Sequence, residues 1–133
     1  YVQVERLTLL SLGASIGVGA LATAMLVVNN LRDIPGDTAS GKRTLAVRIG
    51  DAATRRLYAV LMTVPFLVLP PVAGLSGRPL GSMAVVAVML GTAPVRQVLL
   101  GATGPALIPV LGATGRTQLA YGVLLAAGLF VLL

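Results

Sequence analysis

Long apolar stretches constrain this chain more than any other feature of its sequence. Four uncharged, predominantly apolar runs cover 7–28, 57–77, 79–95 and 117–133. A hydrocarbon core of about 30 Å is crossed by about 20 helical residues, so the first two runs are long enough and the last two are close to the limit. Hydrophobic residues make up 56% of the chain and charged residues 11%, unlike the average soluble domain. We therefore predict an all-α integral membrane protein.

The runs and their flanks place four transmembrane helices, separated by polar or glycine-rich connections. The third is extended past Arg96, because an arginine near a helix end can snorkel to the headgroups. Glycines and prolines at 101–115 predict a loop or a short interfacial helix there, a candidate lid. The helices are expected at about 7–31, 53–75, 79–100 and 116–133, with a motif loop at 32–52.

The N-terminal end does not resemble a signal peptide. The run 7–28 is longer than a typical h-region and lacks both a basic n-region and a cleavage site. Since the chain opens with Tyr1 instead of methionine, we expect a fragment of a larger bundle.

Lysines and arginines are distributed unevenly between the connections, which predicts orientation through the positive-inside rule. The side that carries the motif loop should face the cytoplasm, whereas the opposite side keeps Arg6 and Arg78. The arginine-rich, alanine-rich composition is typical of a GC-rich bacterial genome, so a multi-pass location in a bacterial plasma membrane is expected. The cytoplasmic set is Arg32, Lys42, Arg43, Arg48, Arg55, Arg56, Arg96 and Arg116.

The net charge of +6 follows from this topology and does not call for a nucleic-acid partner. No aromatic-rich basic surface that could stack on bases is evident. Membrane lipid is the expected surrounding. Cysteine and histidine are both absent, which excludes thiolate nucleophiles, Cys or His zinc sites and a Ser-His-Asp triad within these residues.

The first helix carries small residues at steps of three and four. This spacing lets helix backbones approach closely in lipid, so it predicts tight packing within a bundle. The face comprises Gly13, Gly17, Ala20 and Ala24, and Gly19, Ala22 and Thr23 are expected to widen it.

The stretch "VVNNLRDIPGDTASGKRTLAVRIGD", 27–51, is the densely polar part of the chain. Asn29, Asp33 and Asp37 recur every four positions and would line one helix face, with Asn30 beside them. The Pro-Gly pair at 35–36 predicts that the helix frays or kinks between the aspartates, so that Asp37 lies on the first loop turn. Carboxylates at a helix C-terminus oppose the macrodipole, so a cation should accompany them.

Two sources of positive charge are open at this point. Arg32, Lys42 and Arg43 could pair with the acids as a structural cluster. Alternatively, two aspartates with amides nearby offer the hard oxygen ligands that Mg²⁺ prefers and usually shares with water and substrate phosphates. The remaining basic residues would then hold the phosphates.

The stretch "NNLRDIPGDTASGKRTLAVRIGD" resembles the second aspartate-rich motif of the UbiA superfamily of intramembrane prenyltransferases, in the branch that prenylates 1,4-dihydroxy-2-naphthoate. The segment "ALIPVLGATGRTQLAYGVLL", 106–125, is similar to the region that leads into the family's last helix. The resemblance implies a bundle of about nine helices, of which this chain is the C-terminal half. The missing N-terminal half would supply an earlier aspartate motif, so the 133-residue chain alone should be inactive.

By this resemblance, Asp33, Asp37 and Asn29 would bind Mg²⁺ bridged to the diphosphate of a polyprenyl donor. Asn30, Arg32, Lys42, Arg43 and Arg48 would bind the diphosphate itself. Metal and cations would stabilise the leaving diphosphate while the naphthoate attacks the prenyl carbocation. Loss of the carboxylate would then give demethylmenaquinone.

Several of these residues also have simpler explanations. Lys42, Arg43 and Arg48 could be positive-inside anchors. Asp51 is read as the N-cap of the second helix, with Arg55 and Arg56 as interface anchors. Arg116 and Gln118 could reach the acceptor's carboxylate or anchor the last helix at the headgroups.

Two other functions stay open from the sequence. One is a UbiA-type enzyme with a different aromatic acceptor. The other is a transport or structural membrane subunit, because intramembrane carboxylates often mark ion pathways.

Overall fold

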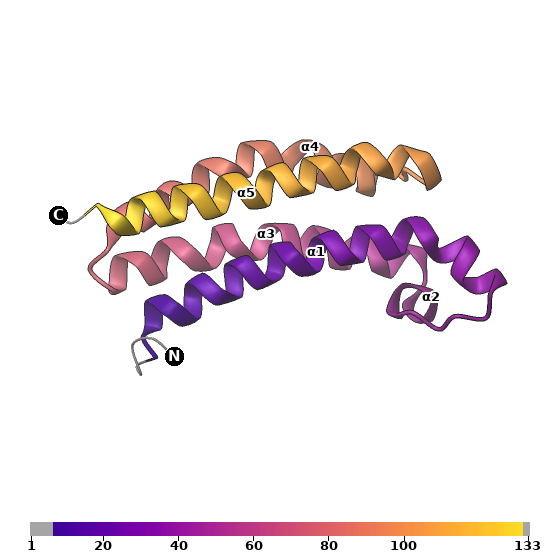
Figure 1. Ribbon diagram of the computed structural model, residues 1–133, viewed down its shortest axis with the longest axis horizontal. Helices are drawn as coiled ribbons and strands as arrows, with labels where there is room; N and C mark the ends of the chain where they lie inside the picture. Colours follow the sequence, from indigo (N-terminus) through magenta and orange to yellow (C-terminus); the bar gives the residue numbers. More distant parts are fainter. Residues whose placement is uncertain (1–6, 132–133) are drawn as a thin grey trace.

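The computed structural model describes residues 7–131, so Arg6 and the last two residues of the expected fourth helix lie outside it. The described part is helical and contains no strand, as predicted. Figure 1 shows long helices lying side by side, with α2 beside one end of α1. The elements are α1 (Leu9–Ala39), α2 (Leu45–Ile49), α3 (Asp51–Leu75), the 3₁₀ helix η1 (Pro79–Ala87), α4 (Val88–Leu99), the 3₁₀ helix η2 (Gly104–Leu107) and α5 (Ile108–Phe130).

Helix α1 opens with a capping box. The Thr8 hydroxyl accepts the Ser11 N–H at 3.0 Å, and Ser11 Oγ accepts the Thr8 N–H at 3.0 Å. The helix has 31 residues, or roughly 46 Å at 1.5 Å per residue. Its apolar part, 9–28, is long enough to cross the hydrocarbon core of the membrane. We therefore place residues 29–39 beyond that core, as a polar extension of the helix.

The predicted end of this helix near residue 31 is wrong, because α1 passes through Pro35 and ends at Ala39. Pro35 lies on the exposed side. The turn after it keeps its own hydrogen bonds: Thr38 Oγ1 donates to the Ile34 carbonyl at 2.7 Å, and the Ser40 N–H donates to the Gly36 carbonyl at 3.0 Å. The prolyl ring removes one backbone donor without ending the helix.

The second and third expected helices agree closely with α3 and with the continuous pair η1 and α4. The expectation of a loop or short interfacial helix at 101–115 is right only for its first part, where the short helix η2 occupies 104–107, because α5 begins at Ile108 instead of residue 116. Pro105 and Pro109 stand in the first turns of η2 and α5, where proline's missing N–H is no loss. Only a short connection at 100–103 is left for the expected lid.

In the described part of the chain, α1, α3 and the η1–α4 pair are long and apolar enough to cross a membrane. Helix α5 has 23 residues and lies alongside them (Figure 1), although Arg116 and Gln118 make its first half more polar. The four-helix expectation therefore agrees with the arrangement, and three of the four satisfy the length and hydropathy requirements.

The small-residue face of α1 forms the centre of the packing. Gly13 and Gly17 are buried, and a Cβ there would meet Val72 of α3 and the hydroxyl of Tyr121 of α5, respectively. The predicted role of this face is confirmed. Gly19, Ala22 and Thr23 do not belong to it, because successive helical positions turn by about 100° and these three are exposed.

Aromatic and hydroxyl side chains join the other helices in the core. The rings of Phe66 and Tyr121 pack edge to face with centroids 5.7 Å apart. The hydroxyls of Tyr58 and Thr114 form a buried hydrogen bond of 2.7 Å between α3 and α5.

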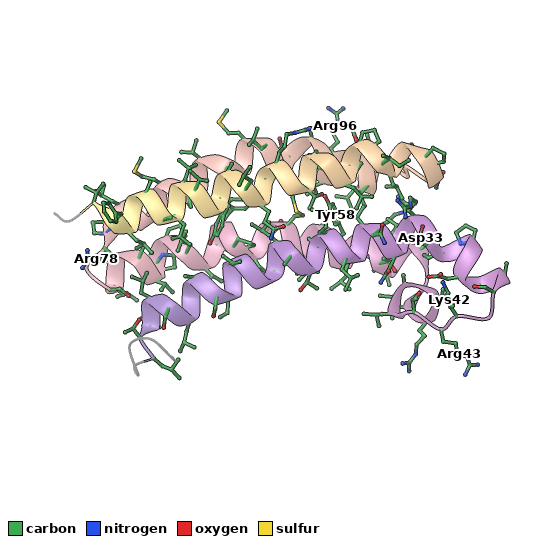
Figure 2. The ribbon with its side chains drawn as sticks, viewed as in Figure 1. Asp33, Lys42, Arg43, Tyr58, Arg78 and Arg96 are labelled. Atoms are coloured by element: carbon green, nitrogen blue, oxygen red, sulfur yellow. The ribbon has the colours of Figure 1, made fainter. Side chains whose placement is uncertain are left out.

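The charged groups mark the two ends of the bundle. Figure 2 places Asp33, Lys42 and Arg43 at one end and Arg78 at the opposite end. We call the first the motif end.

Candidate functional site

Asp33 is the centre of a hydrogen-bonded cluster on the polar extension of α1. Arg32 donates two hydrogen bonds to its carboxylate, from Nε to Oδ1 at 2.8 Å and from Nη2 to Oδ2 at 3.1 Å. Asn29, one turn earlier, donates from Nδ2 to Oδ2 at 3.4 Å. The sequence expectation that Asn29 and Asp33 share a face is thus confirmed.

The electrostatic state of Asp33 follows from this contact. The hydrogen bond from Arg32 and its charge hold the pKa of Asp33 below the ordinary value of 3.8, and the pKa of Arg32 rises in return. Both side chains stay about one-third exposed, at 31% and 38%. A carboxylate that is ionised, oriented and reachable from outside is suited to binding a cation.

Asp37 lies one turn further on and is still helical, which corrects the expectation that it stands on a loop. Its residue is only 9% exposed, and Lys42 Nζ lies 3.6 Å from Oδ1. Gly41 adopts a positive φ of 73°, so the chain reverses and the Lys42 N–H bonds the Asp37 carbonyl at 2.8 Å. The tight turn brings a lysine back to the second aspartate.

Asn30 does not join this cluster. It lines a narrow, mainly apolar pocket of about 110 Å³ between α1, α2 and α3, together with Leu26, Leu45 and Ile49. Within residues 7–131 no hydrogen bond links its side chain to either aspartate. The reason is helical geometry, because Asn30 is turned about 100° from Asn29.

Arg43 and Arg48 lie together but apart from the carboxylates. Both are exposed and line a polar pocket with Val47 beside α2, which Thr44 caps by accepting the Val47 N–H at 3.4 Å. Neither makes an ion pair with an acid in the part of the chain that the structure describes. These two arginines are therefore available to an anion.

Asp51 and Arg55 differ from expectation. The N-cap of α3 is Gly50, with φ 80°, and the Asp51 side chain makes no cap hydrogen bond. Instead, Asp51 pairs with Arg55, which is buried and also bonds backbone carbonyls of a distant segment. Arg55 is therefore not a headgroup anchor, whereas the neighbouring Arg56 is exposed as an anchor would be.

An open groove of about 490 Å³ lies between α1 and α5. It is mostly apolar, with Val18 on one side and Gly115, Gln118 and Gly122 on the other. Gln118 is half-buried in this groove, while Arg116 is exposed.

The groove lies on the same face of α1 as the carboxylate cluster. Val18, Asn29 and Asp33 are separated by steps of eleven and four residues, which return to nearly the same direction on an α-helix. The groove is nevertheless separate from the cluster, because its α1 lining residue Val18 lies roughly 22 Å along the helix from Asp33, and none of the residues that line it belongs to the cluster.

The donor set fits a divalent cation only if a ligand contributes. Among residues 7–131, no group of three or more acidic, histidine or cysteine side chains converges. Asp33 and Asp37, one turn apart, provide two carboxylates, and Mg²⁺ is commonly held by one or two carboxylates plus substrate phosphates. Arg32 and Lys42, which pair with these carboxylates, are cations of the kind that bind such phosphates.

Comparison with known proteins agrees with this chemistry. The sequence model of the UbiA prenyltransferase family matches residues 1–100. The 1,4-dihydroxy-2-naphthoate octaprenyltransferases of Mycobacterium leprae and Mycobacterium tuberculosis are each 39% identical over 97% of the chain. The protein of the same name from Escherichia coli is 44% identical over 47% of the chain and 20% of its own length. No solved structure matches the chain significantly.

The chain spans less than half the length of the two mycobacterial relatives, 43% and 44%.

Proposed function

The chain belongs to the UbiA prenyltransferase family, and we propose that in the complete protein it takes part in transferring a polyprenyl group to 1,4-dihydroxy-2-naphthoate. The observation that carries the proposal is the hydrogen-bonded Asn29–Arg32–Asp33 cluster at the motif end, with Lys42 beside the next aspartate, Asp37. The names of the mycobacterial and Escherichia coli relatives support the same donor and acceptor classes.

Enzymes of this family generally depend on a metal, and we propose Mg²⁺ with Asp33, Asp37 and Asn29 as its protein ligands. Bound Mg²⁺ would supply positive charge to the diphosphate leaving group. Asp33, whose carboxylate is paired with Arg32 in this structure, would serve the metal, and the Arg32 guanidinium would serve the diphosphate.

The remaining basic and amide groups are assigned to the diphosphate. Lys42 Nζ lies 3.6 Å from Asp37 Oδ1. Arg43 and Arg48 line the polar pocket beside α2. Asn30 is retained as a candidate, although its side chain faces α2 and would need to turn. Cations held in advance at these positions stabilise the charge that develops as the allylic C–O bond breaks.

Bond breaking leaves a carbocation on the first prenyl carbon, and the electron-rich naphthoate ring forms the new C–C bond to it. The ring carbon that forms the new bond loses its proton, and the carboxylate leaves as CO₂ and is replaced by a proton, so the immediate product is the hydroquinone form of demethylmenaquinone. The mostly apolar groove between α1 and α5 is assigned to the prenyl tail, and surroundings poor in water would protect the cation from hydrolysis.

We further propose that the chain is the C-terminal half of a bundle in a bacterial plasma membrane, completed by an N-terminal half. The motif end would face the cytoplasm. The separation of Asp33, Lys42 and Arg43 from Arg78 at opposite ends supports this orientation (Figure 2).

The test is prenyl transfer in membranes that contain the complete protein, with polyprenyl diphosphate and either the naphthoate or 4-hydroxybenzoate, with and without Mg²⁺. We expect a decarboxylated, Mg²⁺-dependent product from the naphthoate alone. Asp33→Asn or Asp37→Asn should lower turnover by about 100-fold or more while leaving membrane insertion intact.

Arg43→Gln and Arg56→Gln form a matched pair, because both arginines are exposed and only Arg43 lines the polar pocket. Only the former should weaken donor binding. A product from 4-hydroxybenzoate would refute the assigned acceptor. No product from either acceptor would favour a transport or structural role or an acceptor of another kind.

A further inference from the structure

Arg55 is the one lysine or arginine that is buried among residues 7–131, with 8% of its surface exposed. It lies in the second turn of α3, and all three nitrogens of its guanidinium donate hydrogen bonds. Nε and Nη2 donate to Oδ1 and Oδ2 of Asp51 at 2.6 and 2.9 Å. Nη1 donates to two backbone carbonyls, Val98 at 2.6 Å and Ala102 at 2.9 Å.

These two carbonyls belong to the end of α4 and to the connection that follows it. Val98 lies in the last turn of α4, and its carbonyl accepts the Gly101 N–H at 3.2 Å as well as the bond from Arg55. A positive charge at this place also complements the negative end of the helix dipole. Arg55 therefore ties the first turns of α3 to the α4–α5 connection.

The hydrogen bonds of Arg55 reach segments that adjoin the candidate site on two sides. The segment 40–50 joins α1 to α3. Asp51 follows its last residue, Gly50, and the ion pair between Asp37 and Lys42 lies at its beginning. On the other side, the connection leads from Ala102 into η2, which contacts α1. Leu107 of η2 is fully buried in the same core cluster as Leu31 of α1.

We infer that Arg55 is a positioning residue for the diphosphate site: through Asp51 and the α4 carbonyls it fixes where the motif loop and the α4–α5 connection stand relative to α1. Its influence on catalysis rests on the proposed function, whereas its influence on the geometry does not. A planar guanidinium with donors in several directions can serve one carboxylate and two carbonyls at once, and a lysine ammonium cannot reproduce that pattern.

The experiment compares Arg55→Lys and Arg55→Gln with Arg56→Lys in the complete protein. Arg56 is a matched control, since it is adjacent and exposed and bonds only the Ala52 carbonyl of its own helix, at 3.3 Å. We expect both Arg55 variants to lose about 10- to 100-fold in kcat/KM, because small displacements of positioned groups are costly. The KM for polyprenyl diphosphate should rise, and the KM for the naphthoate should stay unchanged.

A second readout does not depend on activity. The chain contains no cysteine, so spin labels can be attached to Thr38→Cys and Thr103→Cys once any cysteines elsewhere in the protein are replaced. Both threonines are exposed, at the end of α1 and in the α4–α5 connection. The label-to-label distance distribution should broaden in Arg55→Lys and Arg55→Gln and stay narrow in Arg56→Lys.

Full activity with a narrow distribution in Arg55→Lys would overturn the inference and restore the headgroup-anchor interpretation. A broadened distribution with unchanged KM and kcat would also overturn it, because the tie would then be structural only. If the parent protein transfers no prenyl group, the proposed function fails. The distance measurement then still decides whether Arg55 fixes the connection.

Discussion

Replacing Gly17 by alanine should destabilise the bundle at the contact between α1 and α5. A Cβ at this position would overlap the hydroxyl of Tyr121. The tyrosine has little freedom to move, because it is fully buried and its ring packs edge to face against Phe66. One methyl group is therefore expected to shift a central aromatic side chain.

The size of the effect follows from two opposing contributions. Overpacking a core by a methyl group costs about 1–3 kcal/mol, while alanine gains about 0.5–1 kcal/mol over glycine in a helix, so the net loss is about 0–2.5 kcal/mol. Gly19 supplies the control, since it lies on the same helix with nothing within 4 Å of a Cβ. Gly19→Ala should show the gain of about 0.5–1 kcal/mol alone.

The hydroxyl of Tyr121 has no hydrogen-bond partner in the described part of the chain. Tyr121→Phe should therefore be no less stable than the parent, and it should rescue Gly17→Ala by removing the overlapping atom. The assay is unfolding of the purified complete protein in mixed detergent micelles, with the four variants compared as a double-mutant cycle. Equal stability of Gly17→Ala and Gly19→Ala, or failure of Tyr121→Phe to rescue, would refute the reasoning.

Two further predictions follow from other contacts. Thr114→Val leaves the Tyr58 hydroxyl buried without its partner and should cost about 1–3 kcal/mol, whereas Tyr58→Phe should cost about 1 kcal/mol or less because Thr114 keeps its bond to the Val110 carbonyl. The same unfolding assay ranks the two variants, and the reverse order would contradict the assignment. Because Arg32 lowers the pKa of Asp33 below 3.8, the stabilisation from this pair is present above that pH and is lost as the pH falls through the lowered pKa. Arg32→Gln should return the pKa of Asp33 toward its ordinary value, as followed by the infrared carboxyl band of isotope-labelled aspartate, and an unchanged titration would show that Arg32 is not its cause.

Much of the fold could be predicted from the sequence because a membrane leaves few choices. An apolar run of about 20 residues must satisfy its backbone internally, so it forms a helix. The packing face of α1 was equally readable, since glycines and alanines at Gly13, Gly17, Ala20 and Ala24 keep helical spacing. The i,i+4 relation of Asn29 and Asp33 likewise needed no knowledge of other helices.

The helix ends were less predictable. Proline and glycine indicate a break locally, yet Pro35 lies inside α1 and Pro109 opens α5. Whether such a residue ends a helix depends on its exact turn and on the partners of the neighbouring carbonyls. Asp51 was interpreted as an N-cap and Arg55 as an interface anchor, and both interpretations were wrong because nothing in the local sequence indicates that Arg55 would be buried.

The sequence by itself determined that this is a helical membrane chain with a carboxylate cluster on one helix, because hydropathy and helical periodicity are local properties. The tertiary structure decided which cations meet which partners. Arg55 reaches carbonyls 43 and 47 positions away, and the apolar groove exists only where α5 comes to lie beside α1. These relations depend on how separate helices pack, and helix packing places residues together that no spacing along the chain relates.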